Sequence, residues 1–368
     1  MFNHRLAPRN LMSVLLALTA CAISSAAQQT IPEGWQADPD GYDEEWLGEL
    51  DQEVAAGKFP GLEGLVVLRR GKLLIERYFG ETTRDSLHDV RSVGKTLTSA
   101  LLGQALRDGH LRSIDQTLGD FYDLKAHANH SPKKERVSLG HLVSMSSGFE
   151  GFDFVAESPG NEENMYPQPD WVRWTLDLPM ASEREPGESW SYFTAGVVLL
   201  GDILARRVPG GLEVYAHEQL FAPLGIDNYR WGYTPQRVPN TAGGIRMRAL
   251  DLARFGQLYQ DGGRVQGTQV LPAQWVQDSL RPQHTTIDGK DRYGRLFWHR
   301  SFALGPADDS EAPRLAAAYC SGNGGNKIFI FDEVPLVVVI LSSAYGEGAG
   351  HLRAERVLSE YVLPVALD

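Results

Sequence analysis

Cysteine is nearly absent from this chain, which has only Cys21 and Cys320 among 368 residues. Cys21 falls in an N-terminal leader (below), so only Cys320 is left in the folded part. No intramolecular disulfide can then form, and a metal site built from cysteines is excluded. We expect Cys320 to be a buried small side chain, and we expect no metal ion and no cofactor.

Positive charge is also scarce. The chain has 35 lysine and arginine residues against 47 aspartate and glutamate residues, which gives a formal net charge of −12 and a pI near 5.3. Such a chain is a poor partner for nucleic acid. With 42% hydrophobic and 10% aromatic residues, it can bury the core of one large domain or of two closely packed ones.

Long apolar runs are missing, and the one near the N-terminus, residues 11–20, is too short for a stable membrane span. Arg5 and Arg9 precede it and small residues follow it. This is the pattern of a secretory signal, so we predict export across the inner membrane to the periplasm.

Two cleavage sites fit this leader. Residues 18–21, Leu-Thr-Ala-Cys, match a bacterial lipoprotein box, in which residues 1–20 are removed and a lipid on Cys21 attaches the protein to a membrane. Ordinary cleavage would instead remove residues 1–27. The sequence leaves both open.

Several catalytic signatures are absent as well. There is no H-E-x-x-H and no G-x-S-x-G, so the zinc-protease and α/β-hydrolase interpretations lack their main markers. Gly94-Lys95-Thr96 imitates the end of a phosphate-binding loop, but the leading glycine would have to be residue 89, which is Asp89.

What is present is Ser92-Val93-Gly94-Lys95, at the start of a helix with apolar residues at helical spacing. Side chains three positions apart lie on one helix face, so the Lys95 amine can reach the Ser92 hydroxyl and activate it as a nucleophile. The plain alternative is a serine that caps a helix, followed by a solvated lysine.

Two later segments favour the catalytic interpretation. Tyr192 lies in a Pro-Gly-Glu-Ser-Trp-Ser-Tyr stretch that leads into an apolar helix. Gly322-Asn323-Gly324-Gly325 runs almost directly into an apolar strand. In this order, the three segments resemble the motifs of the serine β-lactamase and penicillin-binding superfamily, closest to its class C-like branch, which includes esterases and 6-aminohexanoate-oligomer hydrolases. The resemblance covers about residues 60 to 365.

The resemblance implies acyl transfer through a covalent intermediate. Ser92 would attack the carbonyl carbon, Lys95 and Tyr192 would share the proton transfers, and the backbone N–H groups of Ser92 and Gly325 would bind the oxyanion. The expected substrate-binding residues are those around the second and third motifs: Trp190, Phe193, Thr194, Gly322, Asn323 and Gly324.

The chain departs from the family pattern at two positions. Thr194 stands where a lactamase has the asparagine that holds the acylamino arm, and Gly322 stands where it has the lysine that receives the carboxylate. Both losses favour a small ester or amide as the substrate. The alternatives are a β-lactamase, a D-alanyl-D-alanine carboxypeptidase, or a non-catalytic penicillin-binding-like protein. The pattern carries no prediction of the oligomeric state.

The fold is predicted from the two chain ends. Residues 44–56 have the pattern of an amphipathic helix, and apolar runs at 65–75 and 328–341 are each split by a turn and form hairpins. We therefore expect an α/β (α+β) fold, and the family resemblance implies that it is of the β-lactamase/transpeptidase type. It has an antiparallel sheet built from both chain ends, flanked by helices, with a mainly helical region inserted.

The domains expected are an α/β domain of residues 38–115 and 291–368 and a mainly helical domain of residues 116–290. Within the latter, residues 149–171 mix aromatic and acidic side chains without a clean period. We expect this long segment to be a loop that faces the substrate.

Overall fold

The computed structural model describes residues 34–306, 311–331 and 333–367. An antiparallel sheet lies at its centre, with strand order β2-β1-β13-β12-β11-β10-β9-β8. Its strands are β1 (Leu62–Arg69), β2 (Lys72–Tyr78), β8 (His284–Thr285), β9 (Arg292–Gly294), β10 (Phe297–Ala303), β11 (Arg314–Gly322), β12 (Asn326–Phe331) and β13 (Leu336–Ser342). The predicted fold class, with a sheet built from both chain ends, is confirmed. The leader and Cys21 lie outside the described residues.

Both predicted hairpins form, and they are joined by a pairing between the chain ends. β1 pairs with β13, with Leu65 opposite Ile340 and Val67 opposite Val338. Because side chains alternate along a strand, Leu65 and Val67 enter the core on one face of the sheet, while Val66 enters the core on the other. This explains why the runs read as continuously apolar, since both faces are buried.

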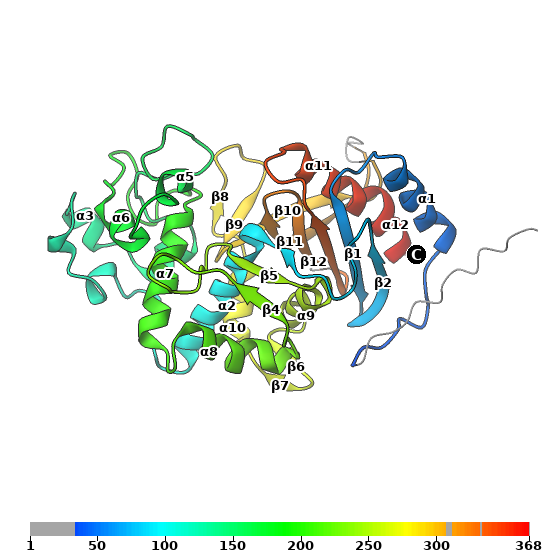
Figure 1. Cartoon of the computed structure of the whole chain (residues 1–368), viewed down its shortest axis with the longest axis horizontal. Coiled ribbons are helices and arrows are strands. Elements are labelled where there is room, and N and C mark those ends of the chain that lie inside the picture. The colour runs from blue at the N-terminus through cyan, green and yellow to red at the C-terminus, as the bar shows by residue number, and fades with distance from the viewer. Residues whose placement is uncertain (1–33, 307–310, 332, 368) are drawn as a thin grey trace, which may run out of the picture.

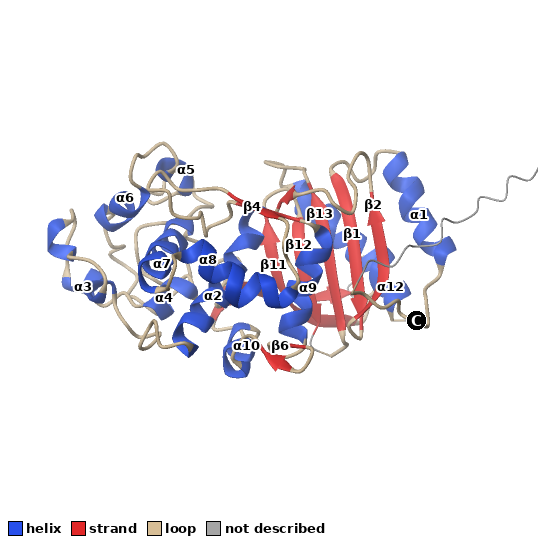
Figure 2. Cartoon of the chain, turned by 60° about the horizontal axis from the view of Figure 1, so that its bottom comes forward, coloured by secondary structure: helices blue, strands red, loops and turns tan. Residues whose placement is uncertain are grey.

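Helices from the two termini cover the outer face of the sheet. These are α1 (Glu44–Ala55), α11 (Ala349–Arg356), the π-helical turn η6 (Val357–Val362) and α12 (Leu363–Ala366). Figure 1 shows α1 and α12 at the right of the sheet. The other face packs against α9 (Ala249–Gln260) and against the helices that lie between the two groups of strands in the sequence, as Figure 2 shows.

The chain between the two groups of strands is mainly helical and lies to one side of the sheet (Figure 1). No described helix is long and apolar enough to cross a membrane. Besides α9, this segment contains α2 (Gly94–Arg107), α3 (Pro132–Glu135), α4 (Leu139–Val143), α5 (Glu162–Met165), α6 (Trp171–Asp177), α7 (Thr194–Arg207), α8 (Leu212–Ala216), α10 (Ala273–Ser279) and the short turns η1 (Arg91–Val93), η2 (Leu118–Asp120), η3 (Leu124–Ala126), η4 (His217–Phe221) and η5 (Ala222–Leu224).

Two small sheets complete the fold. β6 (Arg264–Val265) and β7 (Thr268–Gln269) form a hairpin, and β3 (His88–Asp89), β5 (Ile245–Met247) and β4 (Tyr229–Trp231) form a three-stranded sheet. β3 immediately precedes η1, so this second sheet fixes the chain just before Ser92.

Candidate active site

Ser92 lies in η1, a single 3-10 turn between β3 and α2. The residue before it, Arg91, has a φ of 51°, in the left-handed region that non-glycine residues rarely adopt. Such a conformation costs about 1–3 kcal/mol and persists only where neighbouring contacts enforce it. Here Asp89 supplies one, because its Oδ1 accepts the Arg91 N–H at 3.1 Å. The turn places Ser92 where α2 begins.

Lys95 is one turn further on and almost completely buried, with 1% of its surface exposed. Its Nζ donates to Ser92 Oγ at 2.8 Å and to the Ala242 carbonyl at 2.6 Å. The second bond holds the amine in place from a segment about 150 residues away in sequence. Lys95 is therefore not a solvated lysine, and the helix-cap alternative fails for it.

Tyr192 comes from the other side of the cleft, two residues before α7. Its ring centroid lies 5.2 Å from Lys95 Nζ. Burial raises the pKa of the Tyr192 phenol, while the Lys95 charge and a hydrogen bond with Ser92 partly oppose this. The phenol thus keeps its proton near neutral pH, and the hydroxyl, amine and phenol expected from the sequence share one site.

The glycine-rich segment closes the site from β11. An ideal Cβ built on Gly322 would lie 2.4 Å from the Val90 carbonyl oxygen, so only glycine fits against the chain that leads to Ser92. Asn323 follows and is held on both sides. Its Oδ1 accepts the Gly346 N–H at 2.8 Å, and its carbonyl accepts from Asn326 Nδ2 at 3.0 Å.

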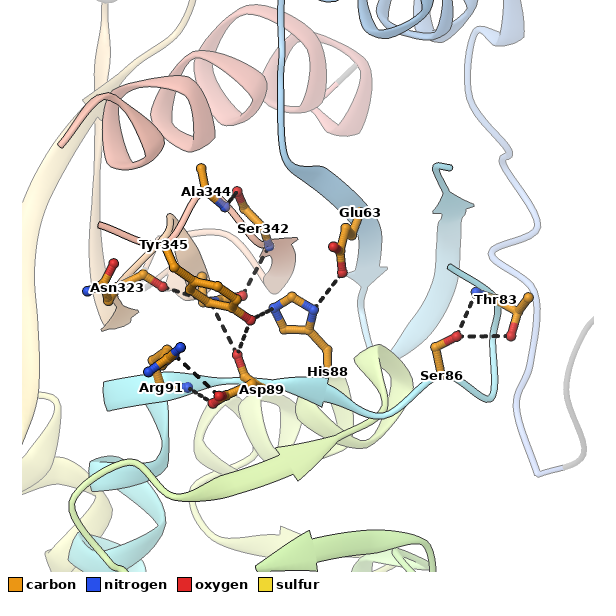
Figure 3. A network of polar contacts seen from close by, with 11 residues as sticks. Glu63, Thr83, Ser86, His88, Asp89, Arg91, Asn323, Ser342, Ala344 and Tyr345 are labelled. Carbon is orange, nitrogen blue, oxygen red and sulfur yellow. Dashed lines mark hydrogen bonds and ion pairs between the residues drawn. The ribbon is translucent and has the colours of Figure 1, made fainter. Parts of the chain in front are cut away.

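A polar network supports both segments from behind, as Figure 3 shows. Tyr345 is at its centre: its hydroxyl donates to the Asp89 carbonyl at 3.0 Å and lies 3.2 Å from His88 Nε2. The other ring nitrogen of His88 contacts Glu63 Oε2 at 2.8 Å. The Arg91 guanidinium lies 4.3 Å from the centre of the Tyr345 ring.

The same Tyr345 ring also limits the glycine-rich segment, because a Cβ on Gly324 would lie 2.8 Å from Tyr345 Cδ1. One side chain therefore contacts the residue before Ser92 and the residue after Asn323. We interpret this network as the set of contacts that fixes the distance between the turn that carries Ser92 and the glycine-rich segment.

These elements enclose a cleft of ≈ 380 Å³. One wall is the loop between α4 and α6, predicted as substrate-facing, which contributes Asp153, Phe154, Asn161, Glu162 and Glu163. The rest of the lining comes from the motifs and the C-terminal region: Ser92, Tyr192, Trp298, Ser321, Gly322, Asn323, Gly346, Glu347, Gly348 and His351. A larger hollow of ≈ 720 Å³ lies at the far edge of the sheet, beside α1 and α12, and Ser92 takes no part in it.

Comparison with known proteins identifies the family. The sequence model of the Beta-lactamase family matches residues 48–362. The chain belongs to the beta-lactamase family. A curated relative named "Beta-lactamase", from Escherichia coli K12, is 24% identical over 215 residues, which cover 54% of this chain and 49% of the relative. The chain spans about half of the length of the curated relatives it matches.

Solved structures show the beta-lactamase fold over most of the chain. EstCE1, described as a hydrolase with promiscuous acyltransferase activity, superposes with a TM-score of 0.68 at 16% identity, covering 87% of this chain and 98% of its own. A class C beta-lactamase from Rhodobacter sphaeroides gives a TM-score of 0.61 at 16% identity. The match covers 85% of this chain and 97% of the lactamase chain.

Besides Lys95, which is buried against Ser92, four residues that the motifs nominated line neither the cleft of this beta-lactamase-family protein nor the hollow next to it. The Gly325 N–H, predicted as an oxyanion donor, donates instead to the Gly322 carbonyl at 3.2 Å, and a Cβ there would meet the Gly350 backbone. Gly324 faces Tyr345 rather than the cleft. Because α7 begins at Thr194, the side chains of Phe193 and Thr194 turn into the core.

The remaining nominated residues lie at the cleft or beside it. Gly322 and Asn323 line it directly. Trp190 lines an adjoining hollow described below. Asp153 was not singled out from the sequence. It sits in a loop without periodic pattern, and only the fold brings it beside Tyr192, whose carbonyl accepts the Asp153 N–H at 2.9 Å.

Proposed function

We propose that the protein is a serine hydrolase that cleaves a small ester or amide through an acyl-enzyme on Ser92. The observation that carries this proposal is the 2.8 Å contact between Lys95 Nζ and Ser92 Oγ in a nearly closed environment. A buried amine that touches a hydroxyl is the arrangement by which a weak nucleophile acquires a base.

The roles follow from which groups touch. Ser92 Oγ attacks the carbonyl carbon while its proton passes to the Lys95 amine. Tyr192, held protonated by its burial, donates its proton to the leaving group and regains one from Lys95, so that protons balance. Water then attacks the acyl-enzyme, the acid leaves, and Ser92 recovers its proton.

The oxyanion donors that we propose are the backbone N–H groups of Ser92 and Asn323. Both residues line the cleft, whereas the Gly325 N–H is already donated within its own turn. Donors fixed in the backbone need no reorganisation as negative charge develops, which is why such sites contribute strongly to catalysis.

The substrate is an uncharged ester or amide rather than a β-lactam. Thr194 is buried and cannot reach a substrate side chain, and position 322 has no room for a lysine. An anionic substrate would then bury its carboxylate without the cation expected at this position, which is costly. The 24% identical relative named as a beta-lactamase keeps β-lactam hydrolysis as the second candidate.

A fluorophosphonate probe tests the chemistry. We expect one adduct on the peptide that contains Ser92, and loss of both labelling and ester turnover, by several orders of magnitude, in Ser92→Ala. Ser99→Ala makes the same substitution at a buried position in α2 outside the cleft and should keep both. A folded Ser92→Ala protein with near-wild-type turnover would remove the proposal.

Substrate preference is tested with the unmodified enzyme. We expect kcat/KM for a short-chain nitrophenyl ester to exceed that for a chromogenic cephalosporin by at least about a hundredfold, or roughly 2.7 kcal/mol. Equal efficiencies would return β-lactams to first place.

Export remains part of the proposal. If the lipoprotein box is used, the protein fractionates with membranes and carries acyl mass on Cys21, and Cys21→Ser releases it into the periplasm. A lipid-free mature N-terminus at Gln28 would establish ordinary cleavage instead.

A further inference from the structure

A second hollow of ≈ 410 Å³ adjoins the cleft of Ser92. The two share four lining residues, Phe154, Trp298, Ser321 and His351, so they lie side by side. The turn between β8 and β9 and helix α11 also contribute to the lining of the second hollow. A substituent next to the scissile bond can extend into it.

One wall of this second hollow is aromatic. The ring centroids of Trp190 and Trp298 are 5.5 Å apart, and Phe152 lies 6.0 Å from Trp190. Trp298 also stacks on Tyr192 at 5.6 Å, so the wall begins at the catalytic cleft itself. Such surfaces bind planar or apolar groups, because they offer ring faces and edges at stacking distance.

The floor carries a buried ammonium group on β12. Lys327 is 3% exposed, and its Nζ donates to Ser321 Oγ at 2.9 Å. Glu355 Oε1 is 4.0 Å away, which is beyond hydrogen-bond distance, and the Tyr319 ring centroid is at 4.8 Å. An ammonium has three donors. The contacts described here use one of them and leave donors for an acceptor atom on a ligand.

The charges next to Lys327 balance, and the exposed Asp288 adds one further carboxylate to the lining of the hollow. Arg300 pairs with Glu355 and, at 3.4 Å, with Asp291, so two cations meet two carboxylates. Asp291 also accepts from the Tyr319 hydroxyl at 2.7 Å. An anionic ligand would have to compete with the two carboxylates already present, and a cationic one would meet Lys327 and Arg300. A neutral ligand with an acceptor oxygen meets neither obstacle.

Burial also sets the charges of His351 and Lys327. It lowers the pKa of His351 to about 4, so this histidine is neutral where the hollow meets the cleft. It also lowers the pKa of Lys327 to about 8, which still leaves most of the ammonium charged at neutral pH.

We propose that the hollow lined by Trp190, Trp298 and Lys327 is a subsite for an uncharged, planar aromatic substituent of the substrate, with Lys327 and Ser321 receiving an oxygen acceptor on that substituent. This inference rests on the proposed function, since it requires that Ser92 reacts with the adjoining carbonyl group. It names the preferred substrate class as a neutral aromatic ester or amide.

Boronic acids separate this inference from the proposal it rests on, because they form a reversible adduct with a reactive serine. The probes are methylboronic acid, 3-acetamidophenylboronic acid and 3-carboxyphenylboronic acid. We expect the neutral acetamido compound to have an inhibition constant at least about tenfold below those of the other two, the size of one hydrogen bond to a charged group. If none of the three inhibits, the serine chemistry itself is wrong.

Inhibition by all three without an advantage for the acetamido compound would overturn the subsite alone, as would tightest binding of the carboxylate. In Lys327→Met, the acetamido advantage should fall by about tenfold while the constant for methylboronic acid stays unchanged. Lys290→Met, the same change on the exposed β8–β9 turn, is the control. An unchanged acetamido advantage in folded Lys327→Met contradicts the role of Lys327. The ligand series on the unmodified enzyme tests the subsite even if the variant does not fold.

Discussion

The strained residue beside the nucleophile shows how single side chains set this site. Arg91 keeps a positive φ because Asp89 holds its N–H and the Tyr345 ring lies against its guanidinium. Such strain is stored where the rest of the structure over-determines it. Because Tyr345 does not line the cleft, we expect it to be a positioning residue that acts through Ser92 and Asn323.

Tyr345→Phe tests this role, because it removes the hydroxyl between His88 and the Asp89 carbonyl but keeps the ring. We expect kcat for an ester to fall about tenfold with KM nearly constant, since only the alignment of the oxyanion donors changes. The free energy of unfolding should fall by about 1 kcal/mol. Tyr122→Phe removes a 2.7 Å hydrogen bond to Asp202 in the helical segment and should cost similar stability without loss of kcat. An unchanged kcat in folded Tyr345→Phe would refute the positioning role.

The sequence could predict that Ser92, Lys95 and Tyr192 lie together, but not the direction of the side chains next to them. Ser92 and Lys95 follow from helical spacing, and Tyr192 from a motif in the expected order. Phe193 and Thr194 were expected to bind the substrate because they are next to Tyr192 in the sequence. Both side chains are buried instead, because consecutive side chains at the start of a helix point about 100° apart. The Gly325 N–H is already donated to the Gly322 carbonyl within the turn, whereas Asn323 lines the cleft. Only the folded backbone reveals this difference.

Among the elements, those with local signals were predicted well. The expected helix at 44–56 is α1, and the apolar runs at 65–75 and 328–341 lie within the two hairpins, β1–β2 and β12–β13. The loop at 149–171 was predicted to face the substrate because it lacks a period, but its internal structure was not foreseen. It contains α5, and one partly buried carboxylate joins α5 to α7.

That carboxylate belongs to Asp153. Its Oδ2 accepts the N–H of Thr194 at 2.7 Å, and its Oδ1 accepts the N–H of Glu162 at 2.9 Å, so it joins the first turns of α7 and α5. Burial raises the pKa of Asp153 to about 6, and the charge of Glu162 adds to this. The loop that walls the cleft is therefore anchored by a group that titrates in the mildly acidic range.

A pH series tests the anchor. Because the native state holds the Asp153 proton more tightly than the unfolded chain, this group stabilises the fold fully only below about pH 4, and its contribution is lost as pH rises to about 6. Asp153→Asn lacks this titration. Its free energy of unfolding minus that of the wild type should therefore rise between about pH 4 and pH 6, by at most about 3 kcal/mol, and stay level above. Urea titrations at several pH values measure it, with exposed Asp123→Asn as the control. A difference independent of pH would contradict the assignment.

At the scale of the whole molecule, the sheet joins the two chain ends. The sequence indicates this only through two hairpins far apart. The pairing of β1 with β13 spans more than 250 residues, and no local pattern encodes its register. The largely helical pattern between the two hairpins indicated where the helical region is inserted, and the family resemblance implied the same architecture. The predicted domain boundaries remain a prediction.

The buried core bears on those boundaries. One continuous cluster of buried side chains includes Val66 and Val337 from the sheet together with Leu200 from α7. A core shared in this way couples the two regions, because opening either one exposes apolar surface of the other. We therefore expect a single unfolding transition.

Leu200→Ala tests this coupling. Leu200 is fully buried, so its truncation should lower the free energy of unfolding by about 2–5 kcal/mol. If the regions unfold together, the whole transition shifts to lower urea, and far-UV circular dichroism, tryptophan fluorescence and proteolysis within the sheet give one midpoint. Leu352→Ala, at an exposed position on α11, should change the stability by less than about 0.5 kcal/mol. If Leu200→Ala instead unfolds residues 116–290 while the sheet keeps its original midpoint, the two regions are separate cooperative units, and the coupling inferred from the shared core is wrong.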